Sequence, residues 1–102
     1  MAGSGQAYKI LLTRTAESER DRLAPDLMRI VNSKLRELAK DPFSLSRKTV
    51  SPPYPRGGMM REFDTLDPNG AMHYFVVLFY FGEDEKTLIV HGIGHRTYGP
   101  RH

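Results

Sequence analysis

Four cationic side chains, with no acidic residue among them, lie between positions 47 and 61 of the 102-residue chain. They are Arg47, Lys48, Arg56 and Arg61. Lysine and arginine bind phosphate through charge, and arginine also presents a planar fork of donors to two phosphate oxygens. The stretch therefore predicts sequence-independent contacts with a polyanion, which weaken as salt is added. A solvated loop is the alternative interpretation of the same residues.

The sequence offers little to other kinds of catalytic site. It contains no cysteine, which excludes disulfides, thiolate zinc sites, iron–sulfur clusters and a cysteine nucleophile. Its histidines and carboxylates do not follow a spacing typical of metal ligands, so we expect no metal and no cofactor. RNA can be cleaved without metal, because the neighbouring 2′-hydroxyl serves as the nucleophile when a base, an acid and cations surround the phosphate.

Composition describes an ordinary globular protein with a slight preference for polyanions. Fifteen Lys and Arg residues against twelve Asp and Glu residues give a net charge of +3. The fractions of hydrophobic (39%), aromatic (10%) and charged (26%) residues predict one modest core. The longest apolar run, Tyr74 to Phe81, is far shorter than the roughly 20 residues of a membrane-spanning helix. The N-terminus lacks a secretion pattern, so we expect a cytoplasmic protein without a membrane partner.

Secondary-structure signals follow one another in the order strand, helix, helix, strand, strand, strand. A proline-rich connection from 43 to 58 separates the helices from the last three strands. We predict a single domain over residues 7–98, with flexible termini at 1–6 and 99–102. The expected fold class is α+β, with two N-terminal helices packed on an antiparallel-dominated four-stranded sheet. The predicted elements are strands at 8–13, 59–66, 72–81 and 87–93, a helix at 16–23 capped by Thr15, and a helix from Pro25 that ends at Asp41-Pro42.

Several local patterns occur in the order and at the spacing of a known family. The chain resembles the RelE/ParE superfamily of type II toxin–antitoxin toxins, and the likeness spans most of residues 7–98. The resemblance implies the RelE-like fold in the order β-α-α-β-β-β. The patterns that carry it are Tyr8-Lys9-Ile10-Leu11-Leu12, Ala16 at the start of the first helix, Leu38-Ala39-Lys40-Asp41-Pro42-Phe43, Arg61, His73-Tyr74-Phe75-Val76-Val77 and Gly94-His95-Arg96.

The resemblance implies two different kinds of activity. RelE-like members are ribosome-dependent endoribonucleases that cut messenger RNA, whereas ParE-like members inhibit DNA gyrase. The first hypothesis is a RelE-like toxin that inhibits translation by metal-free attack of the 2′-hydroxyl, with the ribosome and messenger RNA as partners. The alternative is a non-nucleolytic relative, either a gyrase inhibitor or an inactive protein that binds an antitoxin. Both imply a cognate antitoxin, whose helix or strand covers an apolar groove.

The same resemblance implies the site residues. Arg61 and Arg96 match positions at which the ribonucleases carry catalytic basic residues, and Tyr98 or His102 would transfer protons. Arg47, Lys48, Arg56 and Arg101 would bind RNA. Each residue also has a plainer interpretation: Arg61 in a cross-strand ion pair near Glu62, Arg96 as a surface arginine, Tyr98 as a packing residue and His102 in a disordered tail.

The sequence departs from the ribonucleases at two positions. The resemblance aligns Phe75 with a catalytic arginine, and Phe63 stands where a second basic residue is frequent; both are expected either in the core or as an aromatic platform for a base. Strand alternation places His91 and His95 on one face and Arg96 on the other. We expect His91 and His95 to be structural and His73 to lie at the surface.

Overall fold

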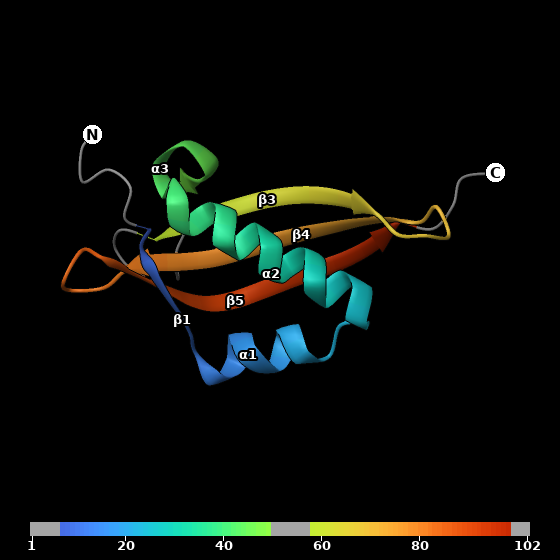
Figure 1. Cartoon of the computed structure of the whole chain (residues 1–102), viewed down its shortest axis with the longest axis horizontal. Coiled ribbons are helices and arrows are strands. Elements are labelled where there is room, and N and C mark those ends of the chain that lie inside the picture. Colours follow the sequence, from blue (N-terminus) through green and yellow to red (C-terminus); the bar gives the residue numbers. More distant parts are fainter. Residues whose placement is uncertain (1–6, 50–57, 99–102) are drawn as a thin grey trace.

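The computed structural model describes residues 7–49 and 58–98 of the chain (Figure 1). The predicted flexible termini, together with Arg56, Arg101 and His102, lie outside the described residues. Two helices lie on one face of a sheet, so the predicted α+β class is confirmed. No helix in the described ranges is long and apolar enough to cross a membrane.

The N-terminal strand leads directly into the first helix. Strand β1 (Lys9–Leu12) is followed by α1 (Arg14–Asp21), whose N-cap is Thr13. The Thr13 hydroxyl accepts a hydrogen bond from Ala16 N at 3.2 Å, which satisfies one of the free amides at the helix start. The prediction that Thr15 caps this helix was therefore wrong by two residues. The threonine that follows the strand most closely has the extended backbone that a cap requires.

Helix α2 (Pro25–Lys40) is the main cover of the sheet. Pro25 is its first residue, as predicted, because the fixed φ of proline suits that position and its missing N–H costs no hydrogen bond there. The predicted apolar stripe faces the sheet and forms one wall of the core. Its buried residues are Leu27, Val31, Leu35, Leu38 and Ala39.

The connection after α2 contains regular structure that the proline-rich composition does not indicate. Asp41 ends α2 and also caps a one-turn helix, α3 (Pro42–Leu45), by accepting a hydrogen bond from Ser44 N at 3.3 Å. A two-residue strand, β2 (Arg47–Lys48), then pairs with β3. The prediction of an irregular connection was wrong over these residues, since two residues are too few to show strand alternation.

Three long strands complete the sheet: β3 (Met59–Leu66), β4 (Met72–Phe81) and β5 (Thr87–Tyr98). The strand order is β1-β5-β4-β3-β2, with β1 parallel to β5 and the other pairs antiparallel. The described sheet thus has five strands where four were expected. The turn between β3 and β4 is closed by Asp67, whose Oδ1 accepts hydrogen bonds from Asn69 N and Ala71 N.

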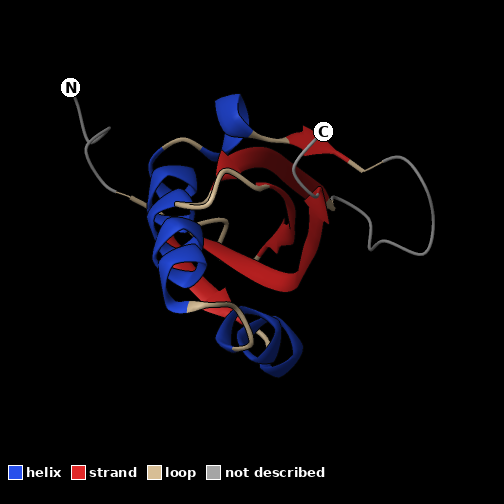
Figure 2. Cartoon of the chain, turned by 90° about the vertical axis from the view of Figure 1, so that its right-hand side faces the viewer, coloured by secondary structure: helices blue, strands red, loops and turns tan. Residues whose placement is uncertain are grey.

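The sheet is strongly curved and has two unlike faces (Figure 2). We call the face covered by α1 and α2 the helix face and the opposite one the open face. Along β4, the helix face carries the buried residues Phe75, Val77 and Phe79. Strand β5 continues five residues beyond its predicted end at Ile93, so its terminal segment lies beside β4.

Candidate functional site

Side chains from three strands form successive rows across the open face. Neighbouring strands lie about 4.8 Å apart, so residues in one row can contact the same ligand. Successive residues of a strand point to opposite faces, so the residues between two open-face rows project from the helix face. Rows of paired residues on the open face are Leu66–Met72–Tyr98, Asp64–Tyr74–Arg96 and Glu62–Val76–Gly94, and Arg47 of β2 pairs with Met60 one row further.

Glu62 and Tyr74 form the polar centre of the open face. The Tyr74 hydroxyl donates a hydrogen bond to Glu62 Oε2, and Arg47 Nη2 lies 2.5 Å from Glu62 Oε1. The Tyr74 hydroxyl, followed by the Arg47 guanidinium, holds the pKa of Glu62 below its ordinary value of 4.5. The same bond raises the pKa of Tyr74 to about 12. At neutral pH this face therefore carries an ionised carboxylate and a protonated phenol.

Arg96 and Tyr98 lie at the end of β5 beside this centre. Arg96 is exposed and pairs directly with Tyr74, while Tyr98 is 45% exposed and pairs with Met72. Because they are two residues apart in a strand, both side chains project from the open face. The structure brings together these two of the predicted site residues, and it adds Arg47 from the other edge of the sheet.

Arg61 lies on the helix face, away from Arg96. It pairs with Val77 in β4 and is only 7% exposed. Its guanidinium donates to Lys34 O at 3.0 Å and to Glu37 Oε1 at 3.1 Å, both on α2. The alternative of a cross-strand ion pair near Glu62 was wrong about the partner, because Arg61 forms its ion pair with Glu37 of α2 rather than with a residue of a neighbouring strand.

The remaining predicted positions divide between the two faces. Phe63 and Phe75 stack at 5.1 Å on the helix face, in agreement with the core interpretation. Phe75 therefore does not occupy an open-face position; its neighbour Tyr74 projects from the open face instead. Lys48 pairs with Met59, whose side chain is buried, so it projects from the face opposite to Arg47.

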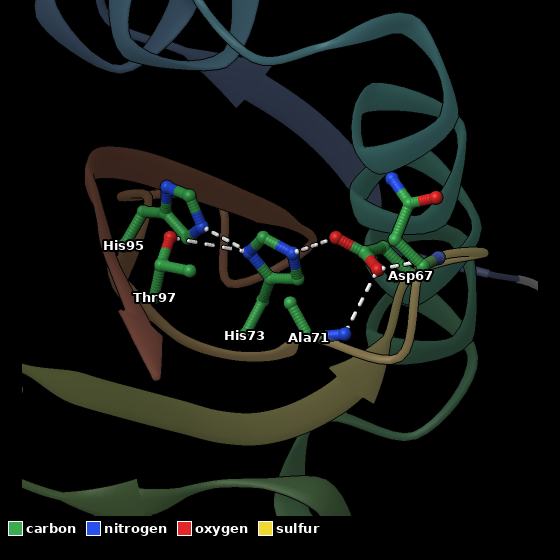
Figure 3. Close-up of polar contacts among 6 residues, drawn as sticks. Asp67, Ala71, His73, His95 and Thr97 are labelled. Carbon is green, nitrogen blue, oxygen red and sulfur yellow. Dashed lines mark hydrogen bonds and ion pairs between the residues drawn. The ribbon is translucent and has the colours of Figure 1, made fainter. Parts of the chain in front are cut away.

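The histidines depart from the predicted arrangement. His73 is buried rather than at the surface, because its ring lies between Asp67 and His95 (Figure 3). A register shift between Leu78 and Phe79 adds one residue to β5. This bulge moves His91 to the open face, where its ring lies 5.6 Å from Tyr80, while His95 stays on the helix face. The two histidines therefore do not share a face.

Across residues 7–49 and 58–98, no three His, Asp or Glu side chains come close enough to hold a metal ion. A shallow hollow of about 230 Å³ lies beside the Arg47–Glu62 pair and is lined also by Ser44, Ser46 and Met60. The donors and acceptors around it suit a polar ligand rather than a metal.

Three solved structures share this architecture. A chain of the toxin–antitoxin complex RelBE2 from Mycobacterium tuberculosis superposes with a TM-score of 0.69 at 16% identity, over 89% of this chain and 100% of that chain. A chain of the intact RelBE toxin–antitoxin complex of E. coli gives 0.56 at 16% identity, over 86% and 95%. A mutant of the E. coli toxin RelE in the free state gives 0.59 at 14% identity, over 87% and 83%. The chain has the RelE toxin fold.

The RelE-like fold is shared at low sequence identity. No family model matches the sequence, and no curated protein matches it. The likeness concerns the backbone, and a fold alone does not determine what its surface does. Function must therefore be argued from the open face.

Sequence reasoning missed the Glu62–Tyr74 bond and the Asp67–His73–His95 contacts. The signal for the first was present, since the turn at 67–70 determines how β3 and β4 pair. That register puts Glu62 opposite Val76 and diagonal to Tyr74. The second required knowing that His95 follows a bulge, which no local pattern indicates.

Proposed function

We propose that this protein is the toxin of a type II toxin–antitoxin pair, acts in the cytoplasm and is neutralised by a cognate antitoxin protein. The proposal is supported by the RelE-like fold, which extends over 100% of the matched RelBE2 chain. Two of the matched structures are described as toxin–antitoxin complexes. Helices α1 and α2 cover one face of the sheet, so the open face is the sheet surface that could contact a substrate.

We propose further that the open face cleaves messenger RNA on the ribosome without a metal ion. The observation that carries this is the position of Arg96 opposite Tyr74 on the open face, because Tyr74 donates a hydrogen bond to Glu62, a carboxylate that is held ionised. Arg96 would stabilise the negative charge that grows on the phosphate. Glu62 would accept the proton of the attacking 2′-hydroxyl, and Tyr98 would donate a proton to the leaving oxygen.

The second candidate is a non-nucleolytic protein. It is favoured because few of the predicted cationic side chains on the described part of the chain remain on the open face to bind phosphate. Of the predicted phosphate contacts, Arg61 bonds to α2 and Arg47 pairs with Glu62. Phe75, which the resemblance aligns with a catalytic arginine, lies in the core and supplies no cation to the open face. Such a protein would inhibit DNA gyrase or would bind an antitoxin without enzymatic activity.

The decisive experiment adds the protein to a bacterial cell-free translation extract and maps messenger RNA ends by primer extension. We expect discrete new ends with the wild-type protein. Arg96→Ala and Glu62→Gln should each reduce them by about 10²-fold or more, because each removes a group that acts in the transition state. Arg29→Ala, an exposed arginine on α2, is the matched control.

Three outcomes separate the candidates. New ends that disappear with Arg96→Ala and persist with Arg29→Ala support the ribonuclease. Intact messenger RNA together with inhibited supercoiling by purified gyrase would contradict it and support the gyrase inhibitor. Intact messenger RNA with normal gyrase activity would leave the antitoxin-binding protein as the remaining candidate.

A further inference from the structure

A chain of hydrogen bonds links the β3–β4 turn to the end of β5 on the helix face (Figure 3). Asp67 Oδ2 lies 2.8 Å from His73 Nε2, and His73 Nδ1 lies 2.9 Å from His95 Nε2. Thr97 Oγ1 approaches the same His73 nitrogen at 3.3 Å. The two imidazole rings stack at 5.1 Å, and His95 also stacks on Phe75 at 4.6 Å. We call these residues, Asp67, His73 and His95, the histidine chain.

Among the described residues, the end of β5 is paired with a strand on one side only. Strand β1 pairs only with Thr87–Val90, and beyond this Glu19 Oε1 on α1 accepts a hydrogen bond from Ile93 N at 2.8 Å. From Gly94 to Tyr98, β5 pairs with β4 and with no other described strand. An edge segment of this kind opens more readily than a strand that is paired on both sides. The side chains of His95 and Thr97 therefore matter for its order.

The number of protons on the two histidines decides whether the chain is intact. The carboxylate of Asp67 accepts the His73 Nε2 hydrogen. His73 Nδ1 and His95 Nε2 form a hydrogen bond when one of these two nitrogens carries a hydrogen and the other does not. This is possible as long as at least one of the two rings is neutral. When both rings are protonated, both facing nitrogens carry hydrogens and the bond is lost. Partial desolvation of the ring, followed by the charge of His73, lowers the pKa of His95, so His95 takes up its proton below the ordinary histidine value of 6.5.

We propose that Asp67, His73 and His95 are positioning residues which hold the end of β5 against β4, and that this end loosens when both histidines become protonated. Arg96 and Tyr98 alternate with His95 and Thr97 in the same segment but project from the open face. Loosening would therefore displace the two residues that the proposed ribonuclease depends on. The positioning itself does not require that activity, whereas its effect on cleavage rests on the proposed function.

Charged groups from the neighbouring elements surround the histidine chain. Glu19 of α1 lies at Ile93, two residues before His95. Asp26 and Arg29 of α2 line a groove of about 520 Å³ together with Asp67. Helix α2 thus brings one carboxylate and one guanidinium to this side, while Asp67 makes the direct contact with His73. The transition is expected to follow the two histidines rather than the helix charges.

Amide hydrogen exchange at pH 7.5 and pH 5.0, corrected for the intrinsic rate, tests the positioning role without reference to activity. In the wild-type protein we expect the amides of residues 95–98 to exchange about tenfold faster at pH 5.0, a ratio typical of losing one hydrogen bond to a charged group. The amides of β4 at 75–79, in the core, should change little. An unchanged ratio at residues 95–98 would overturn the proposal.

Two substitutions separate protonation from packing. His95→Gln retains a side-chain N–H that can reach His73 Nδ1 and cannot be charged, so the pH difference should disappear while residues 95–98 stay protected. His95→Phe keeps the stacking on Phe75 without a donor and should leave these amides unprotected at both pH values. His91→Gln, on the open face, serves as control and should behave as wild type. A pH difference that persists in His95→Gln would contradict the role of the pair.

Cleavage is measured on the same samples. If the ribonuclease proposal holds, messenger RNA ends should become fewer at pH 5.0 with the wild-type protein and should be less sensitive to pH with His95→Gln. If the protein cleaves nothing at either pH, the ribonuclease proposal fails and the exchange result still decides the positioning role.

Discussion

Arginine can serve a catalytic site or a fold, and the two candidate arginines of this protein illustrate both uses. Arg61 donates hydrogen bonds to Lys34 O and Glu37 Oε1, both on α2. Its guanidinium lies 5.7 Å from the centre of the Phe63 ring. The pKa of Glu37 is lowered first by its hydrogen bond to Arg61. Arg61 thus fastens the helix layer to β3, while Arg96 remains available on the open face.

Replacing Arg61 by leucine should destabilise the fold more than it alters the chemistry. Arg61→Leu removes two hydrogen bonds to α2 but leaves Glu37 half exposed to water, so we expect a loss of about 1–3 kcal/mol in the free energy of unfolding. Urea denaturation measures it, and Arg36→Leu, at an exposed position of α2, is the control. Unchanged stability with lost messenger RNA cleavage would instead assign Arg61 to the active site.

At the scale of elements, two glycines give β5 its path across the open face. A Cβ at Gly94 would lie 2.8 Å from Val76 Cγ1, whereas a Cβ at Gly92 would lie 3.4 Å from Leu78 Cδ1. Both glycines pair with these β4 residues, so the side chains of Val76 and Leu78 occupy the space that a Cβ at each glycine would approach.

Alanine at Gly94 should therefore be more costly than alanine at Gly92. Valine is stiff at χ1 and cannot withdraw easily, so we expect Gly94→Ala to destabilise by about 1–3 kcal/mol. Leu78 can move its terminal methyl group, so Gly92→Ala should cost less. Thermal unfolding of both variants measures the difference, and Gly94→Ala combined with Val76→Ala should recover part of the loss. Equal melting temperatures for the two single variants would argue against the close approach.

Periodicity was sufficient to predict the elements that are long and half buried. The stripe of α2 and the alternation of β3 and β4 repeat often enough to locate these elements, and the turn at 67–70 determines their register. From that register one could also have derived that Arg61 projects from the face opposite to Glu62 and Tyr74, whereas the face of Arg96 depends on the bulge in β5. The partner of Arg61 on α2 could not be predicted, since it depends on how the helix packs across the sheet. Neither could β2 or the bulge at His91, because each involves only one or two residues.

At the scale of the molecule, carboxylates that are bonded in the fold make stability depend on acid. Four carboxylates in the described part of the chain have a lowered pKa, and in each the largest cause is one hydrogen bond. Arg61 donates to Glu37, and Tyr74 donates to Glu62. His73 donates to Asp67, and Lys86 N donates to Asp84. A lowered pKa contributes stability that is fully present above the unfolded values of 4.5 and 3.8. This contribution is lost as the pH falls through the lower values of the folded protein.

The urea concentration at the midpoint of unfolding should consequently decrease as the pH is lowered from 5 to 3. The fall should be smaller in Asp67→Asn, which no longer has a carboxylate to protonate beside His73. Glu83→Gln, in the exposed turn before β5, should retain the wild-type fall. A midpoint that stays constant over this range would show that these hydrogen bonds do not favour the ionised carboxylates in the folded state.

The parallel pairing of β1 with β5 couples the two ends of the chain. Lys9 pairs with Thr87 and Leu12 with Val90, so β1, which is synthesised before the other described strands, completes its ladder with β5, which is synthesised after them. Local hairpins between β3, β4 and β5 can form early, but β1 must wait for a loop that encloses most of the chain to close. During synthesis the N-terminal segment remains without its sheet partner until β5 emerges. Truncations before Thr87 would therefore lack the place where the first strand docks.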